Sequence, residues 1–71
     1  MKFNGSAVAT RRCELGMRPE ALAVAIGRSA SSVYLYERGA VEPPISVASR
    51  IAEVLGMEVA DIFTVTDRVS A

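Results

Sequence analysis

The sequence predicts an all-α fold, a compact bundle of about five short helices, with a short C-terminal β-strand as an option. Apolar residues recur at intervals of three and four along most of the chain, the periodicity of helices with one buried face. Glycines follow four of these segments, at Gly16, Gly27, Gly39 and Gly56, where glycine commonly closes a helix. A length of 71 residues, of which 51% are hydrophobic, suits one domain with one modest core.

The first two helices are expected on either side of Gly16. The first runs from a capping residue, Asn4 or Ser6, to Leu15. The second begins at Pro19, whose missing N–H costs nothing at a first helical position, and ends before Gly27. The residues expected on the inward faces of these two helices are Val8, Arg12, Leu15, Leu22, Ala23 and Ile26.

Three further helices are expected after Gly27. Ser29 can cap the third, which stops before Gly39 and has Val33, Tyr36 and Glu37 on one face. Pro43-Pro44 enforces an extended segment, and the fourth then carries an apolar stripe up to Gly56. That stripe comprises Ile45, Ala48, Ile51, Ala52 and Leu55. A last helix covers Val59 to Phe63, and the alternating residues from there to Val69 form either a strand or a frayed tail.

Composition excludes several classes of protein. No apolar run is long enough to span a membrane and the N-terminus lacks a secretory signal, so we expect a cytoplasmic protein. Cys13 is the only cysteine and there is no histidine, which rules out an intrachain disulfide and removes the usual zinc ligands. We expect Cys13 to be a small core residue, and we expect no enzyme activity, metal or other cofactor, or small-molecule ligand.

The net charge is zero but the charges are unevenly distributed. From Met1 to Arg38 there are six cations and three anions, whereas the remainder has two cations and five anions. One end of the molecule is therefore basic and can face phosphate groups although the sum is neutral.

Residues Pro19 to Arg38 have the length of a helix-turn-helix motif, with a short glycine-containing turn between two expected helices. Ala23 is small where the second helix would cross the first at close range, and Gly27 gives the turn its backbone freedom. Ile26 and Val33 are expected to pack beneath the angle between the two helices.

The sequence resembles the lambda-repressor-like (Cro/CI or XRE-type) helix-turn-helix family from about Val8 to Phe63. The matching positions are Arg12, Gly16, Glu20, Leu22-Ala23, Ile26-Gly27, Ser29, Ser31-Ser32-Val33, Glu37-Arg38-Gly39, Pro43, Ile51-Ala52, Leu55-Gly56 and Ile62-Phe63. The resemblance implies a five-helix bundle whose third helix lies in the major groove of double-stranded operator DNA. Most members are transcriptional regulators that act as dimers, so residues 1–63 are expected to form the DNA-binding domain and residues 64–71 a tail.

Carried over to this chain, the resemblance makes residues 29–38 the recognition helix. The positions that would face base edges are Ala30, Ser31, Tyr34 and Leu35. None of these side chains can form the paired hydrogen bonds that asparagine, glutamine or arginine make to a base, so thymine methyl groups and duplex shape should contribute to specificity. The alternative for Tyr34 is an exposed aromatic without a contact, and for Leu35 packing against a dimer partner or the stem of Arg38.

Phosphate contacts are expected from residues that flank the motif, namely Arg18, Arg28, Ser29 and Arg38. The family more often has a serine or threonine at Arg18, glutamine at Pro19 and an apolar residue at Arg28. The added cations would compensate for the hydroxyl cap and backbone donor lost there. The alternative is that these arginines only keep the surface soluble.

Arg12 and Glu37 both lie on apolar stripes, where an unpaired charge is costly, so we expect them to pair. The family resemblance implies the same structural ion pair between the first helix and the end of the recognition helix.

Dimerisation is expected because one recognition helix covers only a few base pairs. The candidate residues are Val59, Ile62, Phe63, Val65 and Val69, either as a helix packed on its symmetry mate or as a strand pair over Thr64 to Val69. The alternative is that they fill their own core. The sequence most resembles a small Cro-type phage or prophage repressor in a bacterial host. A protein-interaction or antitoxin-like module, or an excisionase-like accessory factor, remains the rival hypothesis.

Overall fold

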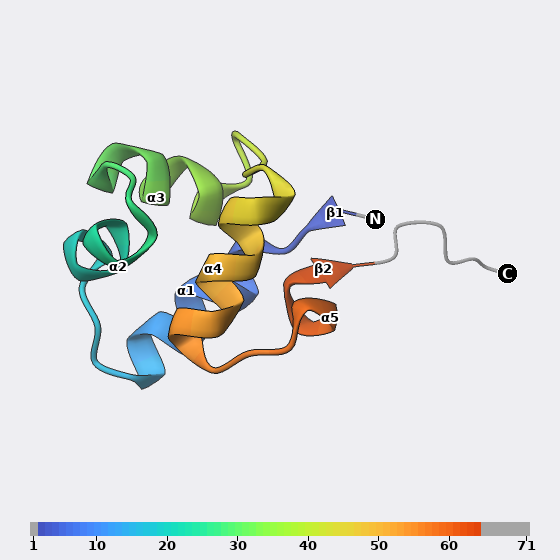
Figure 1. Cartoon of the computed structure of the whole chain (residues 1–71), viewed down its shortest axis with the longest axis horizontal. Coiled ribbons are helices and arrows are strands. Elements are labelled where there is room, and N and C mark those ends of the chain that lie inside the picture. Colours follow the sequence, from blue (N-terminus) through green and yellow to red (C-terminus); the bar gives the residue numbers. More distant parts are fainter. Residues whose placement is uncertain (1, 65–71) are drawn as a thin grey trace, which may run out of the picture.

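The computed structural model describes residues 2–64, which form five helices and two short strands (Figure 1). Their order is β1 (Lys2–Phe3), α1 (Gly5–Glu14), α2 (Pro19–Ile26), α3 (Ala30–Arg38), α4 (Ile45–Leu55), α5 (Val59–Ile62) and β2 (Phe63–Thr64). The predicted all-α class is confirmed, and every helix lies within a residue or two of its expected bounds. No helix in the described part of the chain is both long and apolar enough to cross a bilayer.

The helix ends follow local chemistry. The Asn4 side chain accepts a hydrogen bond from the backbone N–H of Ala7 at 3.1 Å, which makes it the N-cap of α1. Helices α2 and α3 end at Gly27 and Gly39, which have φ values of 71° and 77°. Residues other than glycine rarely adopt this left-handed backbone conformation, so these two glycines fix where the helices stop.

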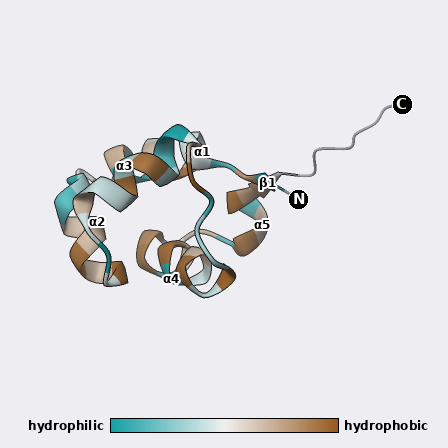
Figure 2. Cartoon of the chain, turned by 90° about the horizontal axis from the view of Figure 1, so that it is seen from above, coloured by the Kyte–Doolittle hydropathy of each residue, from teal (hydrophilic) through white to brown (hydrophobic). Residues whose placement is uncertain are grey.

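The core is built around α4. Five residues of this helix are buried, namely Val47, Ala48, Ile51, Ala52 and Leu55. They pack with residues from the other elements, among which Val8, Leu22, Val33 and Ile62 are at most 1% exposed. Figure 2 shows hydrophobic and hydrophilic residues alternating along the turns of α4, as expected for a helix with one buried face.

Three residues expected inside are exposed. Leu15 follows the last residue of α1 at the turn where the chain reverses, and Ile45 is the first residue of α4, before the helix reaches the core. Cys13 is five residues after the buried Val8, which places it on the other side of α1, where it is exposed. The periodicity was right for the middle of each helix and wrong for Leu15 and Ile45, because a stripe extrapolated to a helix end can leave the core. Cys13 was expected inside because of its residue type, and that prediction is wrong as well.

The strands join the two ends of the described chain. β1 and β2 pair antiparallel, with Phe3 opposite Phe63, and the backbone N–H of Asn4 donates to the carbonyl of Ile62 at 2.6 Å. The pair lies at the end of the molecule remote from α2 (Figure 1). The strand at Lys2–Phe3 was not predicted. The optional C-terminal strand is present at Phe63–Thr64, but it pairs within the chain, and residues 65–69 of the predicted strand lie outside the described residues.

Candidate nucleic-acid interface

Helices α2 and α3 pack against each other and are joined by a three-residue turn, Gly27 to Ser29. Ala23 is 4% exposed at their contact, and the backbone N–H of Arg28 donates to its carbonyl at 2.9 Å. Ile26 and Val33 are buried beneath the turn. A small residue at the contact and glycine in the turn thus produce two short helices of fixed relative orientation.

The side chains of Ala30, Ser31, Tyr34 and Leu35, together called the reading face below, lie on one side of α3. Their spacing of one, four and five residues places them together on a helix, opposite the buried Val33 and Tyr36. Tyr34 is 46% and Leu35 is 37% exposed, Ser31 is exposed, and Ala30 is half-buried. The structure therefore brings the four predicted base-contact residues onto one accessible surface.

Exposed arginines flank this face. Arg28 lies in the turn just before α3 and Arg38 is its last residue, while Arg18 precedes the first residue of α2. The Ser29 hydroxyl accepts from the backbone N–H of Ser32 at 3.2 Å and donates to the Ser32 hydroxyl at 3.1 Å. That hydroxyl is therefore engaged in the helix cap, whereas the three arginine side chains are exposed.

Arg12 and Glu37, expected to pair, join α1 to the end of α3. Arg12 Nε and Nη2 donate to the two carboxylate oxygens of Glu37 at 2.7 and 3.1 Å, and Nη1 donates to the carbonyl of Met17 at 2.8 Å. The two side chains are 12% and 9% exposed. The hydrogen bonds that Arg12 donates to the Glu37 carboxylate raise the pKa of Arg12 above its usual value. One guanidinium therefore holds both the end of α3 and the segment leading into α2.

Two positioning residues were missed from the sequence. A Cβ on Gly5 would lie 2.2 Å from the carbonyl oxygen of Tyr36 and 2.6 Å from that of Glu37, so the start of α1 touches the backbone of α3. The Phe3 ring meets the Tyr36 ring edge-on, with centroids 6.4 Å apart. A glycine that opens a helix can indicate such a close approach, but only once its neighbour in space is known.

The dimerisation candidates are not all available to a partner. Ile62 is fully buried, so the prediction that it forms part of a dimer surface is wrong. Its side chain is part of the hydrophobic core. Phe63 is half-buried and packs edge-on against Phe3 with ring centroids 6.0 Å apart. Val59 is exposed, whereas Val65 and Val69 lie outside the described residues.

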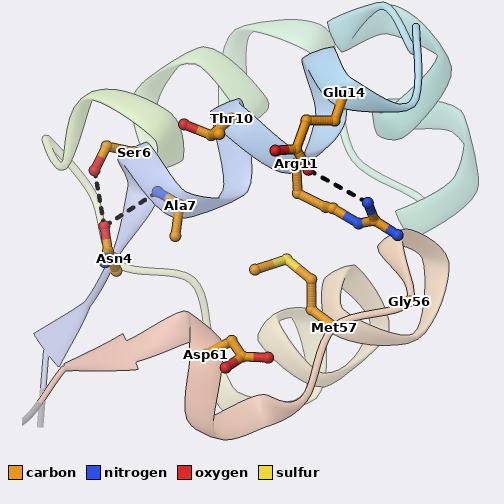
Figure 3. Close-up of a pocket in the computed structure, with 9 residues that line it drawn as sticks. All are labelled: Asn4, Ser6, Ala7, Thr10, Arg11, Glu14, Gly56, Met57 and Asp61. Atoms are coloured by element: carbon orange, nitrogen blue, oxygen red, sulfur yellow. Dashed lines mark hydrogen bonds and ion pairs between the residues drawn. The ribbon is translucent and has the colours of Figure 1, made fainter.

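Away from the motif, an open pocket of about 400 Å³ lies between α1 and the segment from Gly56 to Asp61 (Figure 3). Arg11 crosses it, with Nε donating to the carbonyl of Leu55 at 3.0 Å and Nη1 3.3 Å from the Glu14 carboxylate. The arginine thereby satisfies a carbonyl at the C-terminus of α4. These contacts give Arg11 a structural role.

A short helix, a glycine turn and a second helix with an accessible, cation-flanked face define a helix-turn-helix DNA-binding domain. Residues 5–62 match the family model described as a helix-turn-helix domain. The chain therefore belongs to the helix-turn-helix proteins of the lambda-repressor-like (Cro/CI, XRE) type. A comparison with the sequences of curated proteins finds no match.

Solved structures with the same fold include three bacterial or repressor proteins. The clp gene regulator ClgR from Corynebacterium glutamicum has a TM-score of 0.77 and 30% identity, covering 80% of this chain and 61% of ClgR. The restriction-modification controller protein C.AhdI from Aeromonas hydrophila has a TM-score of 0.77 and 27% identity, covering 83% and 89% of the two chains. The P22 c2 repressor, solved with a synthetic operator, has a TM-score of 0.77 and 24% identity, covering 83% and 89%, a likeness of fold. The chain thus spans about three fifths of ClgR.

Proposed function

We propose that the chain is a sequence-specific transcriptional repressor of the Cro-like phage or prophage type, which inserts α3 into the major groove of operator DNA. The observation that carries the proposal is the reading face, which is accessible and has exposed arginines just before and at the end of its helix. Cations at those places suit the phosphates on both sides of the groove. The P22 c2 repressor, which has this fold, was solved with operator DNA.

The proposal includes a homodimer on DNA, acting in the cytoplasm of a bacterial host. Two recognition helices about 34 Å apart would enter successive major grooves, which one copy cannot do. In this proposal residues 1–63 are the DNA-binding domain, and the tail from residue 64 onward, together with the exposed Val59, forms the contact between copies.

Selection of bound duplexes from a random pool, at two salt concentrations, tests this proposal. We expect an enriched site with two half-sites related by a two-fold axis, and an affinity that falls steeply with salt. An unenriched pool would reject sequence-specific binding and favour a protein-interaction module. Sedimentation of the protein with the selected duplex, with and without residues 64–71, measures whether two copies bind and whether the tail joins them.

Replacing Arg28 or Arg38 with alanine should weaken binding to every duplex and reduce the salt dependence by about one phosphate contact each. Thermal stability should hardly change, because both side chains are exposed. Arg50, an exposed arginine on α4, gives the matched control, and Arg50→Ala should leave affinity and salt slope unchanged. Titration of a labelled duplex at several salt concentrations measures these effects. Equal salt slopes in all variants would contradict the phosphate assignment.

A further inference from the structure

We propose that the reading face recognises the methyl group at C5 of pyrimidines in the major groove, so that it binds 5-methylcytosine as it binds thymine. The inference rests on the proposed function and names the chemical group that the same surface recognises. It makes Leu35 and Tyr34 the specificity-determining residues.

The chemistry of the reading face leaves little else to recognise. An alanine methyl, a serine hydroxyl, a phenol ring and a leucine side chain include no amide and no guanidinium, the groups that pair bidentately with adenine or guanine. The two hydroxyls can each form one hydrogen bond, which distinguishes bases weakly. The apolar carbons of Ala30, Tyr34 and Leu35 match the one apolar group that a base pair presents in the major groove, the thymine methyl.

Ala30 is half-buried and packs against the core, but the core does not need the side chains of Tyr34 and Leu35. Val33 and Tyr36 fill the buried side of α3, while Tyr34 and Leu35 remain 46% and 37% exposed on the opposite side. The backbone N–H of Ala40 donates to the carbonyl of Leu35 at 3.0 Å, which holds the end of the helix and therefore the position of Leu35. Both side chains are therefore accessible on a helix whose end is capped.

Charge indicates that the occupant is DNA. The only acidic side chain of α3 is Glu37, and its carboxylate is turned toward Arg12 on the buried side of the helix. Arg28 and Arg38 lie exposed before and at the end of the reading face, and Glu20 is the one exposed acidic residue of α2. An apolar strip between cations fits a groove in which methyl groups lie between two phosphate backbones.

Methylation of cytosine places a methyl group at the same position of the ring as in thymine. Burial of one such group corresponds to about a fourfold change in affinity. A surface that recognises the methyl by apolar contact therefore binds thymine more tightly than uracil, and 5-methylcytosine more tightly than cytosine.

The test uses the duplex selected from the random pool. Replacing the thymines of one half-site with deoxyuridine, one at a time, should weaken binding about fourfold at each contacted position. A duplex with a C·G pair at one of those positions should bind the protein less tightly than the thymine duplex. Replacing that cytosine with 5-methylcytosine should raise the affinity again about fourfold. Leu35→Ala and Tyr34→Ala should each reduce one of these methyl effects toward no change, with unaltered melting temperatures, whereas Arg38→Ala should weaken all the duplexes equally.

Equal affinities for the thymine and deoxyuridine duplexes, with sequence-specific binding retained, would overturn the inference and leave the proposed function standing. Methyl effects that persist in both Leu35→Ala and Tyr34→Ala would overturn the assignment to this face. A pool from which no sequence is enriched would reject the proposed function itself, and the inference with it.

Discussion

Replacing Glu37 with alanine is expected to lower the free energy of unfolding by about 3–5 kcal/mol, because it leaves the Arg12 guanidinium mostly buried without its carboxylate. A domain of this size is stable by only about 4–10 kcal/mol, so the variant should be close to unfolding at 37 °C. Urea denaturation followed by circular dichroism measures the change. DNA affinity should fall as well, since the pair fixes the end of α3 against α1.

Glu14 provides the control for this experiment. It pairs with Arg11 at 3.3 Å but is exposed, so Glu14→Ala should cost at most about 1 kcal/mol. Replacing both Arg12 and Glu37 with apolar residues of similar size should recover much of the loss, because no unpaired charge then remains. If Glu37→Ala costs no more than Glu14→Ala, the buried pair does not stabilise the fold as argued.

Replacing Gly5 with alanine is the second change expected to have a large effect. The new Cβ would lie 2.2 Å from the carbonyl oxygen of Tyr36, a backbone atom that cannot rotate away, so α1 and α3 must separate. Overpacking of this kind costs about 3 kcal/mol. Because the displaced backbone belongs to α3, we also expect weaker binding to the selected duplex, measured at a temperature at which the variant remains folded.

Thr10→Ala on the same helix is the matched control, since Thr10 is exposed and its replacement should change stability by about 0.5 kcal/mol or less. A Gly5→Ala protein as stable as Thr10→Ala, with unchanged DNA affinity, would show that the contact between α1 and α3 can relax without consequence.

The fold was predictable because local chemistry and tertiary structure agree. Pro19, the Ser29 cap and the glycines at 27 and 39 each act within one turn of the chain, and the observed helix bounds follow them. The pairing of Phe3 with Phe63 was not predictable in the same way. A strand of two residues has no periodicity, and its partner is known only after the five helices have brought both segments together.

The site shows the same division. The four side chains of the reading face and the Arg12–Glu37 pair could be located from the sequence, since position along a helix determines which side a residue faces. Gly5 could not, because its role depends on the distance between two helices. Ile62 was assigned to a dimer surface because an apolar residue near a terminus suits a core and an interface equally, and its burial in the structure decides between them.

The strand pair also bears on the order in which parts of the protein fold and locally unfold. Phe3 and Phe63 are 60 residues apart in sequence, whereas α2 and α3 are separated by a three-residue turn. Closing the longer loop costs more chain entropy, so the motif should form before the strands meet. In native-state hydrogen exchange, the free energy of opening should therefore be lower for the amide of Asn4 than for that of Val33 in the core. Helix α3 should lose the contact between Tyr36 and Phe3 before it unfolds.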